Sequence, residues 1–494
     1  MNLYAMMEQT RPKDAERLVL ETEAGMKFLW RDLDQLTAQC ANYMTTTLGL
    51  SKGDRVAVQV EKSPDNLWLY LGCIRAGLIY LPMNTAYMPD ELDFLLGNAE
   101  PGLVVCRPES LEMVGGIARQ HNVRHVLTMG AEGSGTFMDG ASAAPKAFST
   151  LPCADDDIAA ILYTSGTTGR PKGAMLSHSN LFSNTLDLIK TWGMSETDVL
   201  LHALPIFHTH GLFVASNTAL FSGASMLWLP KFDYGTVMRL LPRATMFMGV
   251  PTYYTRLLAG DEFGKEVCRN MRLFISGSAP LLAETHKAFE HRTGLAILER
   301  YGMTETGMNT SNPLDGERRP GTVGFPLPGV KVRLEGGSEV GVIHVKGNNV
   351  FKGYWRNPEK TAEDFTADGW FFTGDLGQIS ADGYVSIVGR ARDMIISGGF
   401  NVYPKEVEDV IDRIPGVVES AVVGIPHPDF GEAVAAIIVA SDKGLDETAI
   451  IAATKARIAN YKVPKAVKFV AELPRNTMGK VQKTVLRQMF TEAG

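Results

Sequence analysis

The sequence of 494 residues is poor in cysteine, and its five cysteines stand far apart, at positions 40, 73, 106, 153 and 268. Their spacing fits neither a disulfide framework nor a metal or redox motif, and it is typical of a reducing compartment. No apolar run reaches the ~18 residues that a membrane-spanning helix needs. The 48 Lys and Arg residues against 55 Asp and Glu leave a net charge of −7, which offers no polycationic surface for nucleic acid. We therefore expect a soluble, cytoplasmic enzyme that binds neither membranes nor nucleic acid.

Short apolar segments alternate with helical patterns in the first part of the chain, as in an α/β fold with a largely parallel sheet. Residues 55–60, 103–106 and 158–163 are expected strands. A helix is expected from Ser63-Pro64 to about residue 76, because Ser is a favourable N-cap and Pro suits the first helical turn. The stretch 131–157 is rich in Ala, Gly, Ser and Asp, and it is interpreted as a surface connection.

The pattern changes after about residue 330. Strand-like segments at 330–334, 341–346 and 384–388 are separated by Gly-containing turns and predict a β-rich subdomain. From about residue 391, helical and strand patterns alternate in a compact α+β unit. We predict an N-terminal domain of residues 1–390, made of stacked α/β subdomains and the β-rich subdomain, and a C-terminal domain of residues 391–494.

A segment rich in Gly, Ser and Thr follows the strand expected at 158–163. Its sequence, YTSGTTGRPKG, spans residues 163–173. The glycines allow backbone N–H groups to approach an anion, the hydroxyls add donors, and Lys172 adds a point charge suited to phosphate. No Gly-Lys-Ser/Thr closes the spacing of a Walker A loop. The segment therefore predicts a phosphate-binding loop of another type.

Seven motifs in this order resemble those of the adenylate-forming superfamily, which includes acyl-CoA synthetases, adenylation domains of peptide synthetases and luciferases. They are YTSGTTGRPKG (163–173), LPIFH (204–208), SGSAP (276–280), YGMTE (301–305), WFFTGD (370–375), GRARD with ISGGFNVY (389–403), and NTMGK (476–480). The resemblance covers essentially the whole chain. It implies an α/β fold whose small α+β C-terminal domain is mobile, with Arg392 at the hinge.

The resemblance also implies the chemistry. ATP converts a carboxylate to an acyl-adenylate with release of pyrophosphate, and the thiol of coenzyme A then displaces AMP. The ATP-binding residues that match the motifs are Thr164, Ser165, Gly166, Thr167, Thr168 and Lys172 for the phosphates, Ser278, Ala279, Pro280 and Tyr301 for adenine, and Asp375 and Arg390 for ribose. Catalysis is assigned to Thr304 at the α-phosphate, Glu305 as the Mg²⁺ ligand, and Lys480 as the cation at the reacting carboxylate. The loop Ser397, Gly398 and Gly399 is expected to approach the thiol.

Two arginines indicate which acid is used. Arg300 directly precedes YGMTE, and Arg256 follows a strand expected at 245–250. A buried arginine beside an apolar tail would be costly if it were unpaired, so two pocket arginines predict a second carboxylate on the substrate. Arg300, ERYGMTET and PIFHTHG resemble the malonyl-CoA synthetases, which implies malonate as the acid and leaves a side activity on methylmalonate open. The rest of the short pocket is assigned to His208, Thr209 and Met303.

Several alternatives stay open. The acid can be another short carboxylic acid, and the acceptor can be a carrier protein that a stand-alone adenylation enzyme loads. Luciferase-like oxidation and a non-catalytic binding protein are further alternatives. Arg256 can be a surface helix residue, and Arg300 can form an internal salt bridge to Glu299 or another acid. Lys480 is a chemically suitable target for a lysine acetyltransferase, because acetylation removes its charge. The sequence does not distinguish a monomer from a weak dimer.

Overall fold

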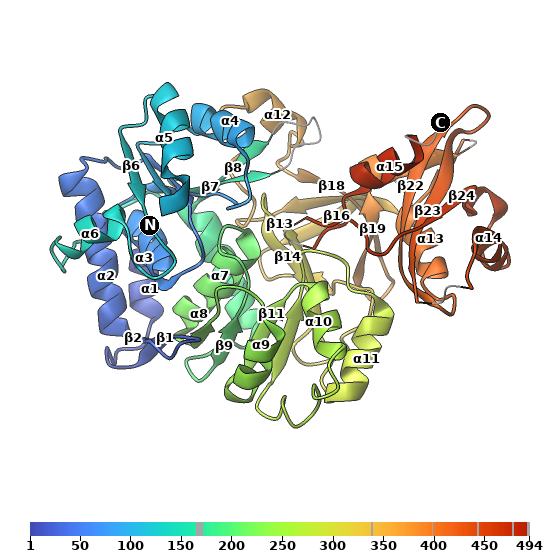
Figure 1. The fold of residues 1–494 in the computed structure, drawn as a ribbon, viewed down its shortest axis with the longest axis horizontal. Coiled ribbons are helices and arrows are strands. Elements are labelled where there is room, and N and C mark those ends of the chain that lie inside the picture. The colour runs from blue at the N-terminus through green and yellow to red at the C-terminus, as the bar shows by residue number, and fades with distance from the viewer. Residues whose placement is uncertain (165–170, 337–338, 398, 442–443, 477–478, 492–494) are drawn as a thin grey trace.

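A computed structural model describes the chain except for residues 165–170, 337–338, 398, 442–443, 477–478 and 492–494. A large N-terminal domain and a smaller C-terminal domain lie next to each other along the long axis (Figure 1). This arrangement confirms the predicted α/β fold with a small α+β domain at the C-terminus. Within the described residues, the strands form four sheets.

A six-stranded sheet forms the N-terminal end of the molecule, in the order β6-β5-β3-β4-β7-β8. Its strands are β3 (Arg55–Gln59), β4 (Ile79–Pro82), β5 (Leu103–Cys106), β6 (His125–Thr128), β7 (Ile158–Thr164) and β8 (Lys172–Ser177). All neighbours run parallel except β7 and β8, which form an antiparallel pair. This pair brings the two ends of the predicted phosphate loop together.

A nine-stranded sheet occupies the centre, in the order β15-β14-β13-β12-β11-β9-β10-β1-β2. Its strands are β1 (Leu18–Thr22), β2 (Lys27–Leu29), β9 (Val199–His202), β10 (Ser225–Trp228), β11 (Met246–Gly249), β12 (Leu273–Ser276), β13 (Leu298–Met303), β14 (Gly307–Ser311) and β15 (Phe325–Pro326). In this spatial order, the strands from β13 to β1 run parallel, whereas β14 is antiparallel to β13. The turn between β13 and β14 carries the end of the YGMTE motif.

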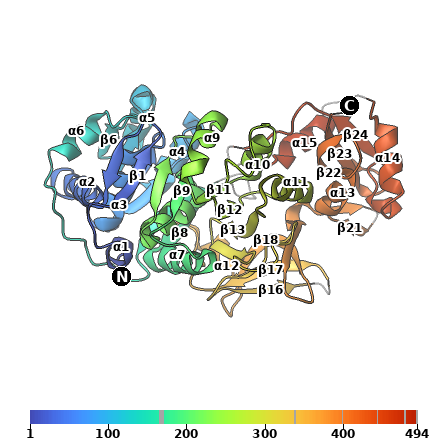
Figure 2. The ribbon, with the colours of Figure 1, turned by 90° about the horizontal axis from the view of Figure 1, so that it is seen from below.

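Helices cover the two large sheets (Figures 1 and 2). They are α1 (Leu3–Thr10), α2 (Trp30–Asn42), α3 (Pro64–Arg75), α4 (Pro89–Ala99), α5 (Leu111–Gln120), α6 (Thr136–Ser142), α7 (His178–Trp192), α8 (Asn217–Ser222), α9 (Tyr234–Leu240), α10 (Pro251–Leu258) and α11 (Ala283–Thr293), with the short π-helices η1 (Tyr43–Thr47) and η3 (His210–Ser216) and the 3-10 helices η2 (Pro108–Ser110) and η4 (Leu241–Arg243). α3 begins as predicted: the Ser63 hydroxyl accepts from the Asn66 N–H at 3.2 Å, and Pro64 is the first helical residue. α6 lies inside the stretch 131–157, where the sequence indicated only a connection.

A four-stranded antiparallel sheet follows, with α12 (Pro358–Glu363) beside it. Its strands, in order, are β16 (Lys331–Glu335), β17 (Gly341–Lys346), β18 (Phe371–Ile379) and β19 (Val385–Arg390). Figure 2 shows this sheet on one side of the central sheet. The predicted β-rich subdomain is therefore present, but β18 is a strand that the sequence analysis did not identify.

After β19 the chain passes through the turn η5 (Ala391–Asp393) into the smaller C-terminal domain. Its elements are β20 (Ile395–Ser397), β21 (Phe400–Val402), α13 (Pro404–Ile411), β22 (Val417–His427), β23 (Gly431–Ala440), α14 (Glu447–Lys455), η6 (Asn460–Lys462), β24 (Ala466–Phe469) and α15 (Lys483–Thr491). β22 and β23 pair over ten residues and form the centre of its sheet. Among the described residues, no helix is both long and apolar enough to cross a membrane.

Candidate active site

The ends of the predicted phosphate loop lie opposite each other. Thr164 closes β7, Lys172 opens β8, and the two residues are paired in register. The Thr164 hydroxyl donates to Oε1 of Glu305 at 3.3 Å, and the Lys172 ammonium lies 4.7 Å from the ring centre of Tyr354. Four predicted phosphate ligands, Ser165, Gly166, Thr167 and Thr168, lie outside the described residues.

Glu305 is a buried carboxylate in the turn between β13 and β14. Its Oε1 accepts hydrogen bonds from the hydroxyls of Thr164 and Tyr354, the latter at 3.2 Å. Burial raises the pKa of Glu305, and the nearby cations Arg390 and Lys172 oppose this rise. In the described part of the chain, no three His, Cys, Asp or Glu side chains gather into a metal cage. A single carboxylate fits Mg²⁺, which proteins commonly hold through one or two carboxylates and the substrate phosphates.

Asp375 lies inside β18, directly opposite Arg390 in β19. Arg390 Nε contacts Oδ1 of Asp375 at 2.7 Å, and the Tyr301 hydroxyl donates to Oδ2. Asp375 is only 3% exposed, so these contacts fix the position of its carboxylate. Because Asp375 belongs to a strand, it is not a turn residue. Its two oxygens are the acceptors that a ribose diol needs, and a bound ribose would compete with Tyr301 for one of them.

The predicted adenine loop follows β12. Ser278 adopts the left-handed conformation, with φ of 74°, which residues other than glycine seldom adopt. Its hydroxyl lies 3.1 Å from Nδ1 of His210. Ala279 is half-buried and Pro280 is exposed beside it. The loop is therefore held in an uncommon conformation by a contact to a histidine that the sequence analysis did not select.

Arg300 is a buried cation that forms no ion pair within the described residues. The residue is 4% exposed, and its Nε and Nη2 have no hydrogen-bond partner among the described residues. Burial lowers the pKa of Arg300 to about 9. A Cβ on Gly277 would lie 2.3 Å from Cζ of Arg300, so the guanidinium packs directly on the Gly277 backbone. Each unpaired buried donor costs about 1–3 kcal/mol, which a bound anion would recover.

Glu299 does not neutralise Arg300. Neighbouring residues of a strand point to opposite faces of the sheet, and the Glu299 carboxylate accepts from the Gly321 N–H at 3.4 Å. Burial raises the pKa of Glu299 to about 8. The alternative of an internal Arg300–Glu299 salt bridge is therefore wrong.

The other predicted arginine lies in a different environment. Arg256 is exposed on α10. The prediction of two pocket arginines requires both residues to be buried, and Arg256 is not. Its aromatic neighbour Tyr253 is half-buried and stacks on Phe232 at 4.3 Å. A role of Arg256 in the acid pocket stays a prediction. Of the two arginines predicted for the pocket, Arg300 is buried and Arg256 is not.

The segment after β9 contributes the other predicted acid-pocket residues. Burial, followed by the charges of Lys480 and Arg300, lowers the pKa of His208 to about 3, so its ring is neutral. Thr209 is buried, and its hydroxyl has no hydrogen-bond partner within the described residues. Met303 is half-buried at the end of β13 and packs against the main hydrophobic core. Of these residues, His208 lies close enough to Arg300 to respond to its charge, and the roles of Thr209 and Met303 in the acid pocket stay predictions.

Lys480 reaches this region from the C-terminal domain. The Asn476 side chain accepts from the Lys480 N–H at 3.0 Å, and Gly479 adopts φ of 74°, so the loop turns sharply. A Cβ on Gly479 would lie 3.6 Å from Oγ1 of Thr252 in the N-terminal domain. The Lys480 side chain contacts solvent, yet protein surrounds it closely enough to lower its pKa, with Arg390 acting in the same direction. Lys480 thus lies between the two domains.

The charges around Lys480 define the site. Asp375 and Glu305 favour its charged form, whereas Arg390 and Arg300 oppose it. The structure therefore gathers the predicted ribose, metal, acid and catalytic residues around one lysine. Thr304 is half-buried in the turn that precedes Glu305.

The predicted loop at the thiol lies within the C-terminal domain. Ser397 is paired with Phe400 in the β20–β21 hairpin and with Gly431 of β23. Gly399, with φ of 81°, forms the turn, and Gly398 lies outside the described residues. Arg392, the predicted hinge, is exposed in η5. Lys480, rather than this hairpin, has the electrostatic contacts to the ATP residues.

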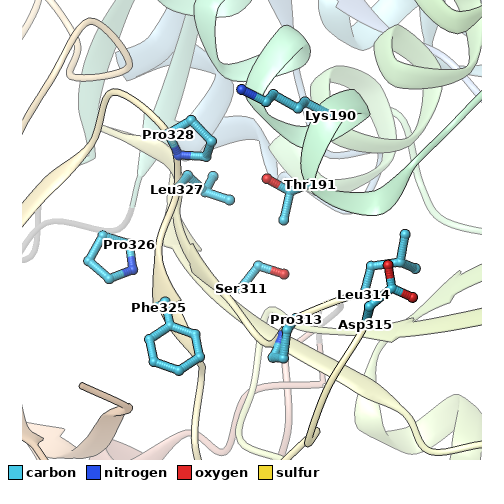
Figure 3. Close-up of a pocket in the computed structure, with 10 residues that line it drawn as sticks. All are labelled: Lys190, Thr191, Ser311, Pro313, Leu314, Asp315, Phe325, Pro326, Leu327 and Pro328. Carbon is cyan, nitrogen blue, oxygen red and sulfur yellow. The ribbon is translucent and has the colours of Figure 1, made fainter. Parts of the chain in front are cut away.

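A separate surface pocket of about 380 Å³ lies between α7 and the β14–β15 region (Figure 3). Its lining residues are Lys190, Thr191, Ser311, Pro313, Leu314, Asp315, Phe325, Pro326, Leu327 and Pro328. No predicted site residue lines it. The candidate active site is therefore defined by the contacts around Lys480 and Arg300, and not by this pocket.

Two site residues were missed from the sequence. His210 contacts Ser278, and Tyr354 contacts both Glu305 and Lys172. The alternating histidines of PIFHTHG were a usable signal for His210, because they flank Thr209. Tyr354 lies 49 residues from its partner Glu305 and carries no local signal.

Two family models match the chain. The model described as AMP-binding enzyme matches residues 7–355, and the model described as AMP-binding enzyme C-terminal domain matches residues 406–480. The structure of ATP-bound MatB from Rhodopseudomonas palustris is 54% identical, with a TM-score of 0.96 over 100% of this chain and 99% of that one. Apo MatB, at the same identity and coverage, gives a TM-score of 0.86.

Several relatives are CoA ligases that are named for different acids. The feruloyl-CoA synthase of an Amycolatopsis species is 35% identical over 94% of this chain and 94% of its own. The malonate–CoA ligase of Arabidopsis thaliana is 35% identical over 89% of this chain and 78% of its own. The sulfoacetate–CoA ligase of Cupriavidus necator is 36% identical over 89% and 88%. Family models and relatives together span both domains, so the chain belongs to the AMP-binding enzyme family, the adenylate-forming superfamily that its motifs resemble.

Proposed function

We propose that this protein ligates malonate to coenzyme A through a malonyl-adenylate intermediate and produces malonyl-CoA, AMP and pyrophosphate. The observation that carries the proposal is the buried guanidinium of Arg300, whose Nε and Nη2 lack partners among the described residues. A fork of N–H donors matches a carboxylate, and a short dicarboxylate offers one carboxylate to Arg300 while the other reacts.

The chain supplies distinct groups for each part of ATP. Lys172 and Thr164 flank the phosphate loop, and Asp375 offers two acceptors for the ribose. Glu305 would hold Mg²⁺, which neutralises phosphate charge when bound. The Lys480 ammonium is the cation placed to stabilise the charge that builds where the carboxylate attacks the α-phosphate.

We further propose that the small domain moves between the two half-reactions, with its boundary between residues 390 and 391. Arg390 belongs to the N-terminal domain through Asp375, whereas Asp393 accepts from Arg487 of α15 at 2.8 Å. The higher TM-score to ATP-bound MatB than to apo MatB supports assigning this arrangement to adenylation. In thioester formation, the hairpin with Ser397 and Gly399 would replace Lys480 at the site.

Sulfoacetate is a second candidate acid. It carries an anionic group at the position of the second carboxylate of malonate, and the relative named for it is 36% identical. Arg300 would serve either anion, so the buried arginine favours this class of short dianions over feruloyl or fatty acids.

Pyrophosphate release should be measured with ATP, Mg²⁺ and CoA for malonate, methylmalonate, sulfoacetate, succinate, acetate and benzoate. We expect the highest kcat/KM for malonate, because it offers one carboxylate to Arg300 and one to Lys480. A monocarboxylate in first place would refute the dianion pocket and keep the reaction class. Replacing CoA with a phosphopantetheinyl carrier protein tests the alternative acceptor in the same assay.

A further inference from the structure

Next to Arg300 lies a second buried group that lacks a partner. His210, the first residue of η3, is 1% exposed, and its Nε2 has no hydrogen-bond partner in the described part of the chain. Its other ring nitrogen, Nδ1, lies 3.1 Å from the Ser278 hydroxyl. Neither the sequence motifs nor the predicted site residues give His210 a role.

One loop brings the His210 ring and the Arg300 guanidinium together. Arg300 packs against the backbone of Gly277, and His210 contacts the next residue, Ser278. The two side chains that have unpaired nitrogens therefore contact two consecutive residues of the adenine loop. The cation that acts most strongly on His210 is Arg300, whereas on His208 it is Lys480. His210 therefore lies near enough to Arg300 to respond to its charge, and His208 near enough to both Lys480 and Arg300.

The Ser278 hydroxyl can donate to Nδ1 of His210 or accept from it, and the tautomer of the ring follows from which of the two it does. Burial and the positive charge of Arg300 hold the pKa of His210 well below its usual value, so the ring is neutral. A neutral imidazole has one donor and one acceptor nitrogen. If Ser278 donates to Nδ1, then Nε2 carries the hydrogen and is a donor, like the free nitrogens of Arg300. Two converging donors without an acceptor are suited to an anion.

We propose that His210 determines specificity by donating its Nε2–H to the distal carboxylate that Arg300 binds. The inference rests on the proposed function, because it requires an acid with a second anionic group. In this proposal the Ser278 hydroxyl donates to Nδ1, and the same residue belongs to the loop predicted to hold adenine. His210 therefore connects the acid pocket to the nucleotide pocket through one hydrogen bond.

Two substitutions separate the nitrogens of His210. His210→Asn keeps an amide near the position of Nδ1 and leaves nothing at Nε2, whereas His210→Gln can place its amide N–H near Nε2. We expect His210→Asn to lower kcat/KM for malonate by about 10- to 100-fold, the range for a lost hydrogen bond to a charged group. The loss should appear in KM for malonate, with kcat/KM for acetate and KM for ATP unchanged. His210→Gln should recover most of the malonate activity.

The control is His286→Asn, which replaces another buried histidine, on α11, whose Nε2 contacts the Ile297 carbonyl at 2.9 Å. It should leave the malonate-to-acetate ratio unchanged. Equal losses on malonate and acetate in folded His210→Asn, or a retained preference for malonate, would overturn the role of His210. A wild-type enzyme that prefers a monocarboxylate would instead overturn the proposed function itself. Thermal unfolding of each variant establishes that it is folded, and the ratio of the two acids is independent of the amount of active enzyme.

Discussion

At the scale of single residues, the proposed choice of acid depends on Arg300. Its guanidinium is buried against Gly277 with two donors free among the described residues, so its removal should affect only substrates with a second anion. We expect Arg300→Ala to lower kcat/KM for malonate by at least about 30-fold, since truncating one partner of a buried charge pair costs about 2–5 kcal/mol. Activity on acetate should fall much less. Arg300→Lys should be intermediate, because it keeps the charge and loses the fork.

Arg256→Ala is the matched control for this experiment. Arg256 is exposed on α10, and truncating an arginine whose side chain is exposed should change activity little. If Arg256→Ala and Arg300→Ala both reduce malonate activity selectively, the pocket contains the two arginines that the sequence predicted. If Arg300→Ala lowers kcat/KM for malonate and for acetate equally, then Arg300 is a structural residue and the proposed dianion pocket is wrong.

At the scale of elements, the short π-helical segment η3 depends on a buried lysine. Lys62 follows β3, and its Nζ lies 2.9 Å from Nδ1 of His202, 2.8 Å from the His202 carbonyl oxygen and 4.2 Å from the Trp228 ring centre. His202 Nε2 in turn reaches the Gly211 carbonyl at 2.9 Å. This chain of contacts joins the six-stranded sheet to the central sheet and holds η3, which begins at His210.

Replacing the lysine at position 62 tests this connection. Lys62→Met should lower the free energy of unfolding by about 1–3 kcal/mol, because both His202 acceptors lose their donor. It should also raise KM for the acid, since η3 positions His210. The control is Lys52→Met, which removes a partly exposed lysine paired with Asp157 at 2.7 Å and should change stability by less than about 1 kcal/mol. Denaturant unfolding with steady-state kinetics measures both effects, and an unchanged KM in Lys62→Met would separate η3 from the acid site.

The same elements show what the sequence could predict. α3 and β5 match their expected ranges closely, because a local N-cap, a proline and a short apolar run define them. β18 was missed, since Gly374 and Asp375 within it resemble a turn. The pairing of β1 with β10 joins residues about 200 positions apart, which no local pattern encodes. Motif residues such as Asp375 were therefore predictable, whereas His210 and Tyr354 acquire their contacts only through the tertiary fold.

At the scale of the whole molecule, the position of one loop decides which half-reaction the structure represents. The positive charge of Lys480 lowers the pKa of His208. The pKa of Lys480 in turn responds to the charges of four residues in the N-terminal domain, Arg300, Glu305, Asp375 and Arg390. The Ser397–Phe400 pair instead lies in the sheet of the C-terminal domain. Both features cannot occupy the site at once, so a complete turnover by the proposed mechanism requires the small domain to reorient.

The two half-reactions should therefore respond differently to loss of Lys480. Lys480→Ala should reduce malonyl-adenylate formation by at least about 100-fold, the magnitude typical of a lost charge-stabilising group. Conversion of supplied malonyl-adenylate and CoA to malonyl-CoA should change little, because Lys480 leaves the site in that arrangement. Lys455→Ala, at an exposed lysine at the end of α14, controls for removing a charge from the small domain. Pyrophosphate release measures the first step, and thioester formation from supplied adenylate measures the second. Equal loss of both would show that Lys480 acts in both steps or maintains the fold of the small domain, and the assignment of this arrangement to adenylation alone would then be wrong.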